Sequence, residues 1–283
     1  MYYRFAALEA VDEAFKGRAT AIVIGAGVAA AVLAPSLAAL GRILVAVPFA
    51  GAYLLVAAMA ASATLILATL PSGQNQGAPT TDASRTPWRV LLTRPAIQTA
   101  ILTTATGHGL MTLVMNATPL AMHAEGMDLT ASGTVIQWHM LGMFLPAFAA
   151  GSLVDRYGAR AIACLGTALL VISALIAFQG LSHLHFIGSS FLLGAGWNLM
   201  LVAGTTQLSA GHGSHERANA QGLMELANGA IAAVMSFTSG ALIAQAGWTA
   251  VNMLVLPALA LVLIVQIRRR APVPLCTEQP TAD

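Results

Sequence analysis

Between two long apolar runs, the chain reads Gly151-Ser152-Leu153-Val154-Asp155-Arg156-Tyr157-Gly158-Ala159-Arg160. The run before this stretch covers residues 130–150, and the run after it covers residues 161–178. Three charges, on Asp155, Arg156 and Arg160, fall within six positions, whereas charged residues make up 8% of the whole chain. We interpret the stretch as a short, glycine-flanked, charged loop between two membrane-spanning helices.

The composition of the 283 residues indicates a membrane protein. Apolar residues make up 57% of the chain, and the mean hydropathy is +0.76. A soluble domain of this length needs more charge to cover its surface. Because a backbone in lipid has to satisfy its own hydrogen bonds, we expect an all-α polytopic membrane protein. The two cysteines, Cys164 and Cys276, form neither a disulfide framework nor a metal-ligand spacing, so we expect no metal and no cofactor.

The apolar runs predict eight spanning helices, since about 20 residues cross the hydrocarbon core. Their expected ranges are 18–40, 44–70, 96–121, 130–153, 161–178, 186–208, 218–244 and 248–267. Residues 1–17 predict an amphipathic lead-in and not a signal peptide. Residues 71–95 predict a linker that is flexible where it is rich in Gly, Pro, Ser and Thr. Residues 268–283 predict a tail with three prolines.

The distribution of basic residues predicts the orientation. With eight spans, both termini lie on the same side of the membrane. Of the 13 Lys and Arg residues, twelve fall on that side, and Arg42 alone falls on the other. Because cytoplasmic loops carry the excess of Lys and Arg, we expect a multi-pass protein of the inner (plasma) membrane with both termini in the cytoplasm.

The charged loop resembles the G-x-L-x-D-R-x-G-x-R signature of the major facilitator superfamily of secondary transporters. The matching residues are Gly151, Leu153, Asp155, Arg156, Gly158 and Arg160. In that family one copy of the signature follows the second helix, and another follows the eighth. The linker at residues 71–95 lies two spans before this signature. In the family, that is where the two halves of the protein are joined if the signature is the second copy. The resemblance thus implies a partial fold with the family's helices five to twelve: two helices of the amino-terminal half (18–70), an interdomain linker (71–95) and a complete six-helix carboxyl-terminal half (96–267). We expect Met1 to be an internal start or the result of a truncated gene model.

Polar side chains inside the spans are candidates for the solute cavity and for proton coupling. Glu225 is the one acidic residue inside an expected span, and a charge at membrane depth costs roughly 2.5–3.5 kcal/mol. Gln221, Glu225 and Asn228 share one helix face. The alternative is that Glu225 is hydrated near the cytoplasmic end or pairs with Arg217.

Two histidines lie near the middle of expected spans. His139 is a candidate for carrying a proton, and the alternative is a neutral histidine bonded to a backbone carbonyl. His108 lies between two glycines that either break the helix or allow close packing. Asn116 is about two turns from His108 and could share its cavity. Trp197 and Asn198 could stack on and orient a flat organic solute, with ordinary helix contact as the alternative.

The signature loop implies a conformational latch. By the family resemblance, Asp155 caps the amino end of the helix near residues 17–19, where the helix dipole favours a carboxylate. Arg156 and Arg160 would then meet Asp12 or Glu13. The alternative is that these arginines serve only as topology anchors.

Taken together, the residues and the resemblance predict a transporter that moves a small organic solute by alternating access, coupled to protons. The interiors of the spans carry no Lys or Arg, which disfavours a strongly anionic substrate. The sequence carries neither H-E-x-x-H nor G-x-S-x-G, so we do not expect an enzyme. The alternative is a non-transporting fragment or a membrane scaffold that lacks the first four helices.

Overall fold

The computed structural model describes residues 16–47, 49–69 and 86–268, and the regular structure in these ranges is helical. Its elements are α2 (Lys16–Leu44), α3 (Ala50–Thr69), α4 (Trp88–Leu91), α5 (Pro95–Ala124), α6 (Leu129–Phe144), α7 (Ala147–Tyr157), α8 (Ala159–Gln179), α9 (His183–Ser209), the short 3₁₀ helix η2 (Ser214–Glu216) and α10 (Arg217–Arg268). Most of the expected lead-in, most of the linker and the tail lie outside the described residues.

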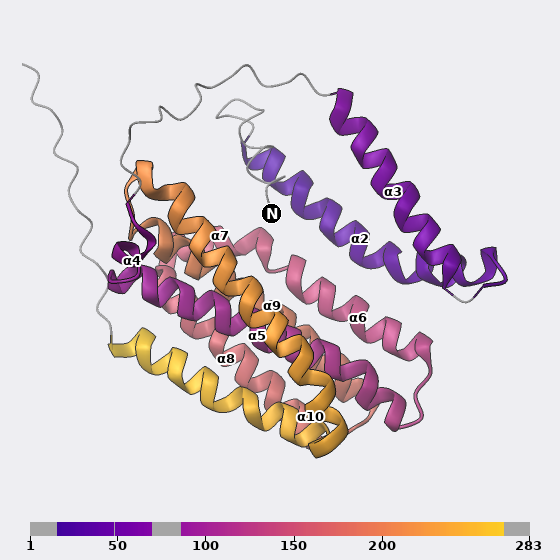
Figure 1. Ribbon diagram of the computed structural model, residues 1–283. Helices are drawn as coiled ribbons and strands as arrows, with labels where there is room; N and C mark the ends of the chain where they lie inside the picture. The colour runs from indigo at the N-terminus through magenta and orange to yellow at the C-terminus, as the bar shows by residue number, and fades with distance from the viewer. Residues whose placement is uncertain (1–15, 48, 70–85, 269–283) are drawn as a thin grey trace, which may run out of the picture.

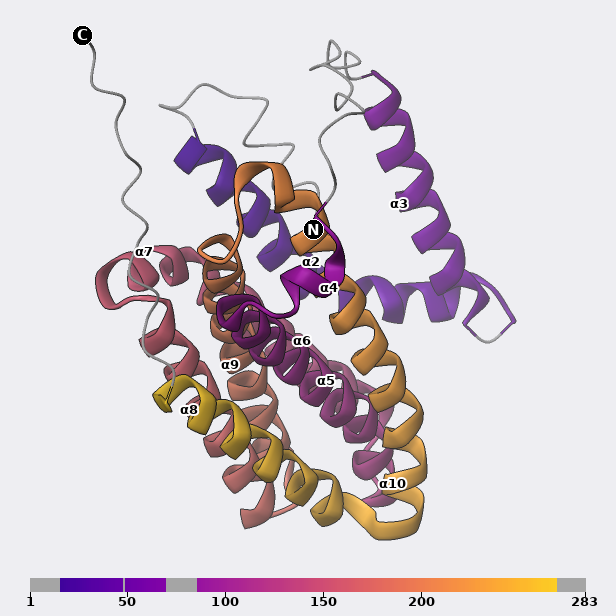
Figure 2. The same ribbon diagram turned by 60° about the vertical axis from the view of Figure 1, so that its left-hand side comes forward.

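The helices from α5 to α10 form one bundle, with α9 packed against α5, α6 and α8 (Figure 1). The helix α2 lies along α6, and α3 packs against α2 on the side away from the bundle, as Figure 2 also shows. In α3 only Gly51 is buried, whereas 14 of the 27 residues of α9 are buried. The central helix is therefore α9, and the large apolar side chains of α3 face outward.

Five described helices are long and apolar enough, by length and composition, to cross a membrane: residues 25–44 of α2, and α3, α8, α9 and α10. The 52 residues of α10 form two legs, because Gly247 has φ 76° and ψ −178° and turns the chain. This is the turn expected at residues 245–247. With α5 and the α6–α7 pair, the described helices supply the eight legs that the sequence predicts. The chain is an all-α membrane protein.

The expected fourth span, 130–153, is not one helix. It ends at Phe144 and resumes at Ala147, because Pro146 lacks the N–H that a continuous helix needs. The loop expected at residues 151–160 is also mostly helical, since α7 runs to Tyr157. The turn is made by Gly158 alone, whose φ of 82° favours glycine. Arg160 then lies in the first turn of α8.

The sequence ends the first span at residue 40 and begins the second at residue 44, and the turn between them is thus predicted a few residues too early. The helix α2 continues to Leu44, and the described residues 45–47 and 49 bend or turn before α3 begins. Gly41 instead allows the close approach of α3: a Cβ atom there would lie 2.6 Å from the backbone nitrogen of Ala52. A glycine that reads as a turn residue in the sequence is thus a contact residue in the fold.

Glycines bring α9 into backbone contact with its neighbours. A Cβ atom added at Gly194 would overlap the carbonyl oxygen of His139 in α6. Between α8 and α9, a Cβ atom at Gly166 would lie 2.8 Å from the carbonyl oxygen of Gly196. Small residues are the usual means of close helix packing in lipid, where burial of apolar surface gives little driving force.

We expect Gly194→Ala to destabilise the protein by about 1–3 kcal/mol, because the added methyl group has to separate α6 from α9. Gly188→Ala, in the same helix, is the matched control, since a Cβ atom there meets nothing closer than 3.8 Å. Thermal unfolding of the purified protein in detergent measures both. Equal midpoints for the two variants would show that the contact at Gly194 does not hold the helices together.

An ion pair fastens the start of α5 to the loop before α10. The Arg94 guanidinium donates to both carboxylate oxygens of Glu216, at 2.6 and 2.8 Å, and to the carbonyl oxygen of Gly211 at 3.0 Å. The backbone N–H of Gly213 donates to the same carboxylate at 3.1 Å. These hydrogen bonds lower the pKa of Glu216 to about 2, and the hydrogen bonds from Arg94 contribute most to this lowering.

The pKa of the Glu216 carboxyl is lower in the folded protein than in the unfolded chain, where it is about 4.3. The ionised carboxylate therefore stabilises the folded protein fully above that pH, and this stabilisation is lost as the pH falls towards 2. We expect Glu216→Gln to lower the unfolding temperature at pH 7 and to flatten its decline between about pH 5 and pH 2. Thermal unfolding against pH measures this, with Glu125→Gln as the control. A Glu216→Gln protein with the wild-type decline would contradict the assignment.

Candidate functional site

The contact between the middle parts of α5 and α9 joins two of the expected site residues. The indole Nε1–H of Trp197 donates to Nδ1 of His108 at 3.1 Å, and the two rings are 5.9 Å apart at 45°. Trp197 is 8% exposed, and His108 is half-buried. Because an indole N–H only donates, Nδ1 of His108 has to accept, so the neutral imidazole carries its proton on Nε2.

The two glycines beside His108 allow close packing and do not break the helix, since α5 is continuous from Pro95 to Ala124. A Cβ atom at Gly107 would lie 3.4 Å from Met200 of α9, and one at Gly109 would lie 2.9 Å from Ile231 of α10. The two glycines thus hold α5 between α9 and α10. His108 is placed where it can reach both helices.

Glu225 lies in the first leg of α10, within electrostatic range of His108, and its side chain is exposed. Its two expected companions have different surroundings. Gln221 is half-buried, whereas Asn228 is 4% exposed and its Oδ1 has no hydrogen-bond partner among the described residues. The three residues therefore do not form one uniformly exposed polar face.

Two further expected residues extend this polar region along the helices. Asn116, two turns from His108, donates to the hydroxyl of Ser236 in α10 at 2.9 Å. Asn198, next to Trp197, is 8% exposed, and its Oδ1 has no partner in the described part of the chain. A buried acceptor without a donor is costly, which makes Asn198 Oδ1 a candidate for receiving a hydrogen bond from a solute.

His139 belongs to a separate contact, between α6 and α9. It is 3% exposed, and its Nδ1 lies 2.9 Å from the carbonyl oxygen of Ser190. Because a carbonyl only accepts, Nδ1 carries the proton. The other ring nitrogen, Nε2, and the Ser190 hydroxyl are buried without a partner among the described residues. The geometry matches the neutral, carbonyl-bonded histidine that the sequence left open as the alternative, and it does not bring His139 to His108.

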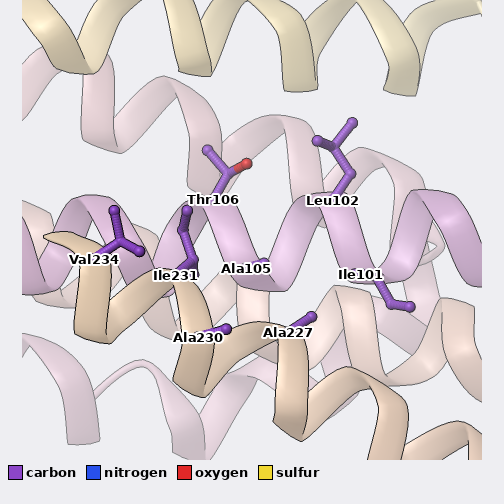
Figure 3. A pocket seen from close by; sticks show the side chains of 8 residues that line it. All are labelled: Ile101, Leu102, Ala105, Thr106, Ala227, Ala230, Ile231 and Val234. Atoms are coloured by element: carbon purple, nitrogen blue, oxygen red, sulfur yellow. The ribbon is translucent and has the colours of Figure 1, made fainter.

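An apolar groove of about 430 Å³ runs between α5 and the first leg of α10. Figure 3 shows its lining, which is Ile101, Leu102, Ala105, Thr106, Ala227, Ala230, Ile231 and Val234. Ile101, Ala105 and His108 recur at helical spacing, so His108 continues the α5 wall by one turn. The groove has one polar side chain, Thr106, and is suited to apolar groups.

The charged loop holds the end of α10. Arg160 donates to the carbonyl oxygen of Ile267, near the carboxyl end of α10, where a cation is favoured. Asp155 and Arg156 are exposed, and the Arg156 guanidinium lies 5.2 Å from the ring centroid of Tyr157. Gly151 is exposed and meets no neighbouring atom within 4 Å. The helices α2 and α7 come into contact, but the proposed partners Asp12 and Glu13 lie outside the described residues.

Sequence reasoning missed one buried polar network. The amide of Gln266 in α10 donates to the hydroxyl of Thr103 in α5 at 2.7 Å, and the amide of Gln207 in α9 donates to Gln266 at 3.0 Å. The signal was present, since a glutamine near the end of an apolar span has to find partners in lipid. In the described residues no group of three or more His, Cys, Asp or Glu side chains could hold a metal ion.

Comparison with known proteins places this arrangement in a family. Residues 108–279 match the family model described as Major Facilitator Superfamily. The chain is 35% identical over 273 residues to the riboflavin transporter RfnT of Brucella anthropi, covering 95% of this chain and 68% of RfnT. It is 34% identical over 146 residues to YdeG of Bacillus subtilis, an uncharacterized transporter of the major facilitator type, covering 51% of this chain and 34% of YdeG. With its helical membrane fold, the chain therefore belongs to the Major Facilitator Superfamily, whose members are transporters and not enzymes.

Proposed function

We propose that the protein moves a flat, uncharged heteroaromatic solute of the riboflavin type across the membrane by alternating access. The observation that carries this proposal is the similarity to a riboflavin transporter along 95% of the chain. The residues of the site support it. Trp197 offers an aromatic face, and the open Oδ1 of Asn198 is an acceptor for a ring N–H.

The charge distribution also favours a neutral solute. The helices α5, α6 and α9 carry no Lys or Arg at all, and the basic residues of α10 lie at its two ends. A phosphorylated solute would lack a counter-charge at membrane depth, where an unpaired charge is costly. Riboflavin carries no net charge at neutral pH and combines a flat ring system with a polar chain.

We also propose that transport is coupled to protons through Glu225 and His108, with His139 as a further candidate. Glu225 of α10 lies within electrostatic range of His108 of α5, and both can exchange a proton. By the positive-inside rule, we place the protein in the plasma membrane with both termini in the cytoplasm. In that orientation the loop at residues 151–160 lies on the cytoplasmic face, where we propose that Asp155 latches against the start of α2.

We expect Trp197→Ala to weaken riboflavin binding by about two- to thirteenfold, corresponding to the ~0.5–1.5 kcal/mol of an aromatic pair. Quenching of flavin fluorescence on titration with the purified protein measures the affinity. Trp138→Ala is the matched control, because Trp138 is 42% exposed and packs edge-on against Phe191. Equal affinity in the Trp197→Ala and wild-type proteins would contradict the site. Binding without uptake into vesicles would favour the alternative of a non-transporting membrane scaffold.

We expect Glu225→Gln to abolish accumulation driven by a pH gradient while leaving riboflavin binding at fixed pH in place, because the amide keeps the shape but cannot exchange a proton. Uptake into proteoliposomes, with and without an imposed gradient, measures the coupling. Glu125→Gln, at the far end of α5, is the control. Gradient-driven uptake that survives Glu225→Gln would remove Glu225 from the coupling mechanism.

A further inference from the structure

We propose that His108 is a positioning residue for Trp197, and that a proton bound at Nδ1 of His108 releases the indole. The proposal deepens the proposed function and rests on it, since it assigns the proton a specific action on the aromatic residue that contacts the solute. The site of action is the 3.1 Å hydrogen bond from Trp197 Nε1 to His108 Nδ1.

The release of the indole from His108 follows from the hydrogen-bond donors and acceptors that the two rings carry. An indole has one N–H and no acceptor nitrogen, and a neutral imidazole has one acceptor nitrogen. When His108 takes up a proton from water, the proton binds to the lone pair of Nδ1, and both ring nitrogens become donors. Two N–H groups then face each other, so the hydrogen bond breaks. When the proton leaves, Nδ1 accepts from Trp197 again, and no other bond changes.

The surroundings supply one counter-charge for the resulting imidazolium. On α10 it is Glu225, and no other Asp, Glu, Lys, Arg or His lies between Arg217 and Arg268. On α9 no ionisable side chain lies beyond His185. On α6, His139 uses its Nδ1–H on the carbonyl oxygen of Ser190. The pH response of this contact therefore depends on His108 and Glu225.

The close packing of α5 confines the effect of protonation to the Trp197 side chain. Gly107 and Gly109 hold α5 against Met200 and Ile231 with little room to shift, so the breaking of the hydrogen bond moves the Trp197 side chain and not the helices. The freed indole N–H and the open Oδ1 of Asn198 then offer one donor and one acceptor on consecutive residues.

The test is a tryptophan fluorescence titration of the full chain in detergent, without solute, from pH 8.5 to pH 4.5. We expect the wild-type emission to change in one step, because the indole loses its acceptor and meets an imidazolium. Trp197→Phe should lose the step. His108→Gln should lose it as well, because the amide oxygen accepts from the indole at every pH. His123→Gln, which changes an exposed histidine in the last turn of α5, is the matched control and should retain the step.

A step that persists in Trp197→Phe or His108→Gln, or a wild-type protein without a step, would overturn the proposal. If the variants do not fold, nitrogen NMR of the histidine-labelled wild-type protein gives the same answer. Nδ1 of His108 should lack a proton at pH 8.5 and should gain one over the pH range of the fluorescence step, and a proton on Nδ1 at pH 8.5 would contradict the proposal. The titration contains no solute, so the fluorescence step can be observed even if Trp197→Ala binds riboflavin with wild-type affinity. In that case the proposed function fails and the proposal about His108 stands.

Discussion

Backbone contact between helices is the interaction on which this molecule depends. In lipid, apolar side chains gain little by leaving one apolar surface for another, so helices are held by close packing and by hydrogen bonds between them. The central helix α9 meets α6, α8 and α5 through Gly194, Gly196 and Gly204, where a Cβ atom would overlap the neighbouring helix. That closeness brings the polar side chains of α9 within hydrogen-bonding distance of their partners. The candidate site is thus a consequence of the packing.

Several polar side chains of the bundle pair across helices, and we propose that two unpaired amide oxygens beside them receive hydrogen bonds from the solute. Trp197 with His108, Asn116 with Ser236, and Gln266 with Thr103 each join two helices. An unpaired polar group at membrane depth is expensive. The open amide oxygens of Asn198 and Asn228 are therefore informative, since each needs a donor that the described residues do not provide.

Much of the fold could be predicted from the sequence, because lipid imposes length and composition on each span. The turn at Gly247 was found in this way. The break at Pro146 and the helical course of residues 151–157 were missed, since apolar runs do not show where one helix gives way to another. The candidates proposed for the site were found because polar groups are rare in spans. Their pairing was not, because Trp197 and His108 are 89 residues apart and meet only through the packing of two helices.

A structure of the full chain in lipid nanodiscs with riboflavin bound is the most direct test of the claim that solute binds where α9 meets α5. We expect the flat ring of riboflavin to contact the indole of Trp197, with a ring N–H directed at Asn198. Riboflavin bound elsewhere would contradict that claim. One such result is riboflavin in the apolar groove between Ala105 and Ala230, with Trp197 still hydrogen-bonded to His108 and not touching the riboflavin.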